Sequence, residues 1–275
     1  NCDWILRMDA DEQLEVDDDF DWSPLNKKKA QSFNMTALSP GSIYFRTWLW
    51  NSKYPWKFAH DRRHECIYLD DVGENFERVE LDKGFRHIIT NDGETWDDKN
   101  KFLTDALELE KQKVPTNKLL DDLYHFWYIG KSYYDSTRGD YPLGEDHTKE
   151  YARRTIFYFN QYLNYKHNYQ QTGRAFGIDE MGYFALFAMG NMWKIIGDYE
   201  KSIDCGMRAE EFAPLRNEHI VLLAECFDAL GDFESMRYQT DRLMDPNRKL
   251  PFPQYNFLLN MNCYNDTGKY CEFLH

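Results

Sequence analysis

Residues 190–200 (GNMWKIIGDYE) and residues 224–234 (AECFDALGDFE) decide the fold of the second half of this 275-residue chain. The two stretches lie 34 residues apart, and each ends in a Gly-Asp pair followed by an aromatic residue and a glutamate. Small residues open both stretches and let two helices of one hairpin approach closely, while the Gly-Asp pair predicts the turn that reverses the chain. Pro214 and Pro246 then predict where the second helix of each hairpin ends.

An earlier and less regular copy of the pattern precedes these two. Gly130, Tyr133 and residues 139–141 (GDY) fit the same scheme with two residues inserted. Thirty-four residues is the period of the tetratricopeptide repeat, so the second half resembles a tetratricopeptide array of about three hairpins, partly degenerate. The alternative is a helical bundle in which the Gly-Asp pair recurs by chance. In either case this half is predicted to be a scaffold.

The first half has the composition of strands and loops. An apolar run over residues 4–8 predicts a buried strand that ends in the acidic segment 9–12, and residues 42–68 are rich in aromatic and β-branched side chains. One more strand is expected over residues 85–89, and helical spacing begins at residues 96–113. We therefore predict an α+β domain over residues 1–114, followed by an all-α repeat domain over residues 115–275.

Charge and cysteine content weigh against several classes of protein. With 33 basic and 47 acidic residues the net charge is −14, which repels the phosphate backbone of nucleic acids and anionic membrane surfaces. No run of about 18 apolar residues predicts a membrane span. The six cysteines form no C-x-x-C pair, so we expect free thiols in a reducing compartment, that is, a cytoplasmic protein.

The sequence lacks required residues of several familiar metal-binding and catalytic motifs. A calcium-binding loop that starts at Asp9 needs glycine at its sixth position, where Leu14 stands. The pair His64-Glu65 begins like the helix of a zinc protease, but Tyr68 occupies the place of the second histidine, and no G-x-S-x-G motif is present. The D-x-D segment Asp9-Ala10-Asp11 after a strand is the pattern that is left.

The order of several short motifs carries a resemblance over nearly the whole chain. The motifs are residues 4–12 (WILRMDADE), residues 44–46 (YFR) leading through Trp56 to His64-Glu65, and residues 85–87 (FRH) before the helical region. In this order the chain resembles the later half of a family 2 glycosyltransferase of the GT-A fold, in the subgroup that carries tetratricopeptide repeats. Members of that family have further strands and helices before the D-x-D segment, so the resemblance implies that this chain is a fragment without the nucleotide-binding half.

The resemblance also implies roles for individual residues. Asp11 and His87 would bind a divalent cation, Mn²⁺ or Mg²⁺, and Asp9 would orient the waters of the metal or the ribose of the donor. Glu65 matches the position of the general base that takes a proton from the acceptor hydroxyl. Such a cation suits the chemistry, because it neutralises the diphosphate that leaves a nucleotide sugar. Direct attack by the acceptor would invert the anomeric carbon.

Each of these residues also has a structural interpretation. Asp9 and Asp11 could form a solvated turn, Glu65 could pair with a neighbouring arginine, and His64 fits a positioning role near the substrate. We expect Arg46 and Trp48 at the substrate, but these two residues and Trp56 could equally belong to the core. The aromatic residues fit both places, because sugars and core side chains both pack on aromatic faces.

The sequence therefore predicts an inverting, metal-dependent glycosyltransferase that moves a sugar from a nucleotide-sugar donor to a hydroxyl on a glycan or protein acceptor. The repeats would dock the acceptor or a protein partner. The alternative is a tetratricopeptide interaction protein whose transferase-like part is inactive. A glycosidase that uses Glu65 with an aspartate is weaker, because it gives the D-x-D segment and His87 no role.

Overall fold

A computed structural model gives the fold, and its described residues fall into two compact units, one over residues 3–89 and one over residues 100–245. The structure describes residues 3–8, 12–26, 32–39, 42–58, 67–68, 78–80, 84–89, 100–112, 119–138, 145–170 and 179–245.

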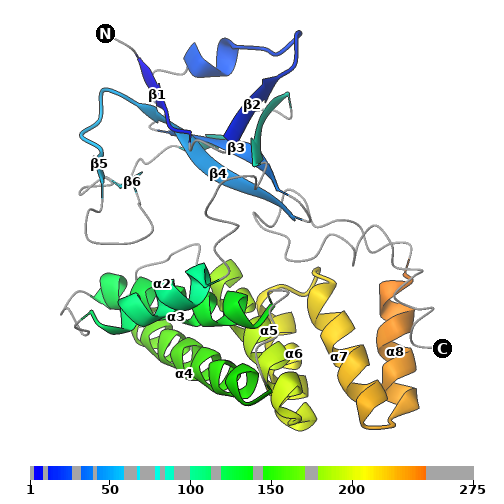
Figure 1. The fold of residues 1–275 in the computed structure, drawn as a ribbon. Coiled ribbons are helices and arrows are strands. Elements are labelled where there is room, and N and C mark those ends of the chain that lie inside the picture. The colour runs from blue at the N-terminus through cyan, green and yellow to red at the C-terminus, as the bar shows by residue number, and fades with distance from the viewer. Residues whose placement is uncertain are drawn as a thin grey trace. The chain divides into compact units, whose positions relative to one another are not determined.

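The first unit is built on a mixed sheet (Figure 1). Its strands are β1 (Trp4–Leu6), β2 (Glu12–Val16), β3 (Ser32–Ser39), β4 (Ser42–Asn51), β7 (Arg78–Glu80) and β8 (Phe85–Ile89), with the short helix η1 (Ser23–Asn26) after β2. Strands β5 (Lys57–Phe58) and β6 (Ile67–Tyr68) form a separate antiparallel pair.

The order of the main sheet is β1-β4-β3-β8-β2, with β7 also paired to β3. The hairpin β3–β4 is antiparallel, whereas β7 and β8 both run parallel to β3 along its other edge. The side chains of Phe33 and Met35 are fully buried and centre a core that includes Leu49, Trp50 and Phe85. The aromatic and β-branched composition of residues 42–68 correctly predicted strands there, namely β4, β5 and β6. The strand predicted over residues 85–89 is β8.

One prediction for this unit is wrong. Strand β1 was expected to be buried, but Ile5 is 47% exposed and Leu6 is 38% exposed. The reason is the position of the strand, because β1 lies at the edge of the described sheet and pairs there with β4 alone. The apolar composition of the run does not distinguish an edge strand from a central one.

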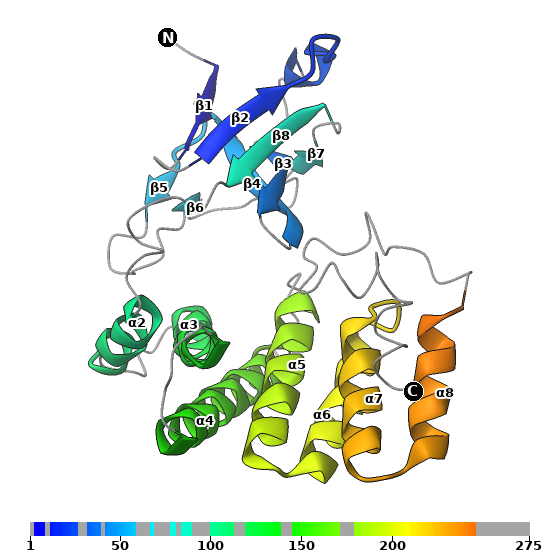
Figure 2. The same ribbon diagram turned by 45° about the vertical axis from the view of Figure 1, so that its right-hand side comes forward.

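The second unit is a row of antiparallel helices that pack in chain order (Figures 1 and 2). The helices are α2 (Lys101–Glu110), α3 (Leu119–Arg138), α4 (Glu145–Gln170), α5 (Asp179–Ile196), α6 (Tyr199–Phe212), α7 (Glu218–Ala229) and α8 (Phe233–Leu243). Helix α2 packs on α3, and the hairpins α3–α4, α5–α6 and α7–α8 follow. This is a tetratricopeptide-like array, as the period of 34 predicted.

The turns of the last two hairpins repeat in detail. Gly197 has φ +90° and Gly231 has φ +73°, values that glycine adopts without a Cβ penalty. In each hairpin the following aspartate caps the second helix by accepting a hydrogen bond from the backbone N–H three residues later, at 3.2 Å for Asp198 and 3.1 Å for Asp232.

The buried faces of α6 and α8 repeat at the same offset. The buried positions are Ser202, Cys205, Gly206 and Ala209 on α6, and Met236, Gln239, Thr240 and Leu243 on α8, each 34 residues from its counterpart. A chance recurrence of Gly-Asp would not reproduce a whole buried face. The repeat therefore determines the packing as well as the turns.

Candidate functional site

The predicted metal site lies largely outside the described residues. Asp9 and Asp11 fall there, and β2 begins at Glu12, directly after Asp11. His87 is on β8, and its backbone pairs with Leu14 of β2 on one side and with Ala37 of β3 on the other. The strand that carries His87 is therefore hydrogen-bonded to the strand that follows the D-x-D segment, while the side chain of His87 lies outside the described atoms.

An ion pair strengthens the contact between these two strands. Arg86, next to His87, lies opposite Glu15 in the register. Its guanidinium contacts Asp17 Oδ1 at 2.5 Å and Glu15 Oε2 at 3.6 Å. Glu15 is on β2 and Asp17 directly follows it, so this ion pair helps to fix β2 on β8.

The remaining predicted residues are on β4 or outside the described chain. Arg46 on β4 pairs with Met35 of β3. The register between β3 and β4 shifts between Phe33 and Asn34, which leaves Trp48 as the extra residue on β4. Such an irregularity is a β-bulge, in which one strand carries one residue more than its partner. His64 and Glu65 lie outside the described residues, so their roles stay predictions.

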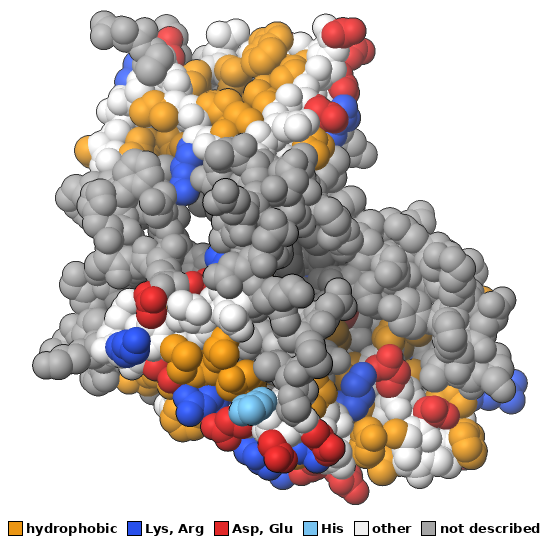
Figure 3. Space-filling model, in the orientation of Figure 1, with side chains coloured by type: hydrophobic (Ala, Val, Ile, Leu, Met, Phe, Trp, Pro, Cys, Tyr) orange, Lys and Arg blue, Asp and Glu red, His pale blue; other side chains and the backbone are white. Residues whose placement is uncertain are grey.

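Within the described parts of the chain, no group of three or more histidine, cysteine or carboxylate side chains could hold a metal ion. None of the described helices is long and apolar enough to cross a membrane. On the face of the helical unit in Figure 3, acidic and basic side chains lie intermixed, so the negative net charge does not gather into one patch there.

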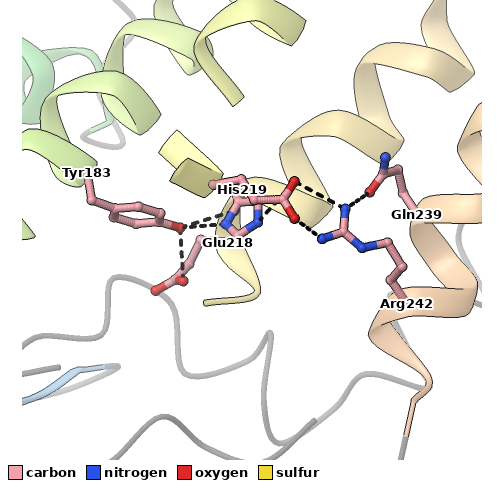
Figure 4. Close-up of polar contacts among 6 residues, drawn as sticks. Tyr183, Glu218, His219, Gln239 and Arg242 are labelled. Atoms are coloured by element: carbon pink, nitrogen blue, oxygen red, sulfur yellow. Dashed lines mark hydrogen bonds and ion pairs between the residues drawn. The ribbon is translucent and has the colours of Figure 1, made fainter. Parts of the chain in front are cut away.

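A buried polar network joins the last two hairpins and was missed by the sequence analysis (Figure 4). The Tyr183 hydroxyl, on α5, donates a hydrogen bond of 3.2 Å to Glu218 Oε2 and accepts one of 3.2 Å from the backbone N–H of His219. Arg216 contacts Glu218 Oε1 at 3.4 Å, and its guanidinium lies 4.6 Å from the centre of the Tyr183 ring. All four residues are at most 1% exposed.

The network continues across the second helices of the hairpins. His219 Nε2 lies 3.9 Å from Glu210 of α6, and Glu210 forms an ion pair with Arg242 of α8, which also donates to Gln239 (Figure 4). Helices α5 to α8 are therefore joined through charged groups. The only signal in the sequence is the run Arg216-Asn217-Glu218-His219, placed directly before the apolar residues of α7.

A second polar cluster ties α2 to the hairpin α3–α4. Glu110 of α2 accepts hydrogen bonds from Arg154 at 2.9 Å and from the Tyr158 hydroxyl at 2.8 Å, both on α4, and Arg154 also donates to the Tyr133 hydroxyl at 3.0 Å. Burial, reinforced by Glu110, raises the pKa of Tyr158 to about 12 and raises the pKa of Tyr133 further. Both phenols therefore stay neutral at physiological pH, where the Tyr158 hydroxyl donates to Glu110 and the Tyr133 hydroxyl accepts from Arg154.

The cysteines described on the repeats are free and buried. Cys205 and Cys226 form no disulfide, which agrees with the expected free thiols. Burial raises the pKa of Cys205 to about 12, and it raises the pKa of Cys226 as well. Both thiols therefore stay protonated at physiological pH, and both side chains pack in the interior of the repeats.

Comparison with known proteins adds little to this description. No family model matches the sequence, and no curated protein matches it. Three chains of solved structures match. One of them, "MamA MSR-1 C2", has 13% sequence identity over 52% of this chain and 89% of its own length, with a TM-score of 0.22. A TM-score this low carries no argument, so the repeat interpretation rests on the turns, caps and buried faces described above.

Proposed function

We propose that the helical unit is an interaction scaffold that holds a protein or peptide partner. The observation that carries the proposal is the repetition, 34 residues apart, of the turn, the cap and the buried positions of the second helix in α5–α6 and α7–α8. Stacked hairpins of this kind form extended surfaces. Such a surface can bind a partner without catalytic or metal-binding groups.

Ion pairs between successive hairpins support a rigid scaffold. Lys194 of α5 pairs with Glu225 of α7, and Glu210 of α6 pairs with Arg242 of α8. Each pair joins equivalent helices of neighbouring hairpins. A surface whose helices are fixed in this way loses less conformational entropy when a partner binds.

The scaffold proposal is tested by selecting, from a random peptide library, the peptides that bind to the full chain. We expect enrichment of related sequences with dissociation constants of about 1–100 µM, the range of modest interfaces. Bound peptide should slow hydrogen exchange in α5 to α8 and leave the sheet unit unchanged. Enrichment of unrelated sequences, or protection confined to the sheet unit, would contradict the proposal.

A second function, metal-dependent glycosyl transfer, is favoured by the pairing of β2 with β8. Strand β2 follows Asp11 and is hydrogen-bonded to the strand of His87, where Leu14, three residues after Asp11, is the residue opposite His87. In the proposed site Asp11 and His87 would hold one cation. Oxygen and imidazole ligands suit Mn²⁺, with Mg²⁺ as the other choice. When bound, the cation would neutralise the departing diphosphate of a nucleotide sugar.

The other predicted residues complete the proposed transferase. Asp9 would orient the donor, and Arg46, Trp48 and His64 would contact the substrate. Glu65 would take the proton from the acceptor hydroxyl as it attacks. The helical scaffold would then bind the acceptor or a protein that brings it.

Donor hydrolysis by the full-length protein tests this second proposal. With Mn²⁺ and a panel of nucleotide sugars, Asp11→Ala should lower the rate of donor hydrolysis about 100-fold or more. Loss of a residue that only hydrogen-bonds to a metal ligand already lowers activity by up to about 100-fold, and loss of the ligand itself should lower it at least as much. Asp19→Ala removes an exposed carboxylate from the turn after β2 and serves as the matched control. Equal rates in wild type and Asp11→Ala would end the transferase proposal and leave the scaffold proposal standing.

A further inference from the structure

The two hairpins α5–α6 and α7–α8 differ at the side that faces the next hairpin along the chain. On α6, Gly206 faces Leu223 of α7, where a Cβ would lie 2.9 Å from the leucine side chain, and Glu210 reaches His219. Along this side the positions Ile196, Tyr199, Ile203 and Glu210 are half-buried. This is the side of a hairpin that the following hairpin covers.

The counterparts of these four half-buried positions, 34 residues later, are exposed, whereas Thr240, the counterpart of Gly206, is buried. Leu230 is 46% exposed, Phe233 is 64% exposed and Met244 is 53% exposed, with the exposed Arg237 between them. Three of these four positions are large and apolar. We call Leu230, Phe233 and Met244 the terminal face. A polar residue would be expected at the open end of an array, so the terminal face has the composition of an internal contact between hairpins.

The sequence after α8 continues the repeat. At 34 residues beyond Gly231-Asp232 stands Asn265-Asp266, and asparagine is the residue that best replaces glycine at a positive φ. Lys269 follows Asp266 by three residues, as Lys201 follows the capping Asp198.

Large apolar or aromatic residues of this segment stand at repeat positions that are also large and apolar in the earlier copies. Met261 corresponds to Phe227, and Tyr264 corresponds to Leu230. The positions buried on α6 and α8 correspond to Tyr270, Phe273 and Leu274. The small residue of the earlier copies is not repeated, since Leu258 stands at the position of Ala224.

We infer that the terminal face is the docking surface for residues 247–275 of the same chain, as a further helical hairpin that follows α7–α8 with the 34-residue period. These residues lie outside the described part of the structure. At the 34-residue offset the counterparts of α7 and α8 span residues 252–277, of which residues 252–275 are in this sequence. The inference depends on neither proposed function, since it concerns the packing of the repeat alone.

Hydrogen exchange of the full chain, read by mass spectrometry, tests this inference. In the wild type, peptides from residues 254–275 should exchange at least about 10-fold more slowly than an unfolded chain. Phe233→Glu and Met244→Glu should each remove that protection, because a buried carboxylate would oppose docking. Tyr238→Glu is the matched control, since Tyr238 is 62% exposed and its counterpart on α6 is the exposed Asp204.

Three results would overturn the inference. The first is unprotected exchange of residues 254–275 in the wild type, and the second is equal protection in Phe233→Glu and Tyr238→Glu. The third is protection that depends on protein concentration together with a dimer mass that Phe233→Glu abolishes, which would assign the terminal face to a second copy of the chain. Unchanged exchange in α5 and α6 shows in each variant that the array is still folded.

Discussion

Replacing Glu218 by alanine should lower the free energy of unfolding of the helical unit by about 3–5 kcal/mol, the range for breaking a buried ion pair from one side. The side chains of Arg216 and Glu218 are 1% and 0% exposed, so water cannot replace the carboxylate that the arginine loses. The Tyr183 hydroxyl loses an acceptor in the same step. Urea unfolding followed by circular dichroism at 222 nm measures the change.

Two further variants separate the charge from the packing. Glu218→Gln keeps an acceptor for Tyr183 but removes the negative charge, so its loss of stability should be smaller than that of Glu218→Ala. The double variant Arg216→Met, Glu218→Leu replaces both charges by apolar groups of similar size and should recover most of the loss, because a buried ion pair is often no more stable than its apolar replacement. Glu211→Ala removes an exposed carboxylate from α6 and should change stability by less than about 0.5 kcal/mol. A loss below about 1 kcal/mol in Glu218→Ala would contradict the expected role of the network.

The turns, the caps and the order of the helices in the helical unit could be predicted because the same sequence pattern recurs in two hairpins that pack alike. Gly197 and Gly231 mark chain reversals that only glycine adopts easily, and the pattern around them shows which helix faces are buried. The strand over Phe85–Ile89 was predictable for a similar reason, since a short run of aromatic and β-branched residues has few other stable conformations.

The buried network could not be predicted, because arginine and glutamate in a segment after a proline are usually exposed. Only the fold brings Tyr183 of α5 against Glu218, 35 residues later, and compensates the desolvated charges. The sheet order was out of reach for a related reason. The register of His87 with Leu14 and Ala37 joins segments distant in sequence, and no local pattern encodes such pairing. For the predicted site, the sequence supplied residue types and their order, and the fold adds the neighbouring strands β2 and β8.

Gly190→Val should destabilise the helical unit by about 3 kcal/mol, at the upper end of the usual cost of overpacking a core. A Cβ at this position would lie 2.5 Å from Leu222 Cδ2 of α7, and 3.4 Å from both Cys205 Cβ and the Ser202 carbonyl oxygen of α6. The valine methyl groups extend further into the same space. The Ser202 hydroxyl donates to the Gly190 carbonyl at 2.8 Å, and this bond should be lost as α5 and α6 separate.

A matched pair of variants shows whether this close approach is the cause. Ala229→Val adds the same side chain to an exposed position at the end of α7, so it reports the propensity of valine in a helix without a clash. Combining Gly190→Val with Leu222→Ala removes the leucine methyl group that the new side chain would meet. The double variant should therefore lose less stability than the sum of the two single variants, because the cavity left by one substitution accepts the bulk of the other. If the losses simply add, contact between α5 and α7 does not restrict Gly190. The small residue at this position of the repeat would then reflect only its approach to the backbone of α6.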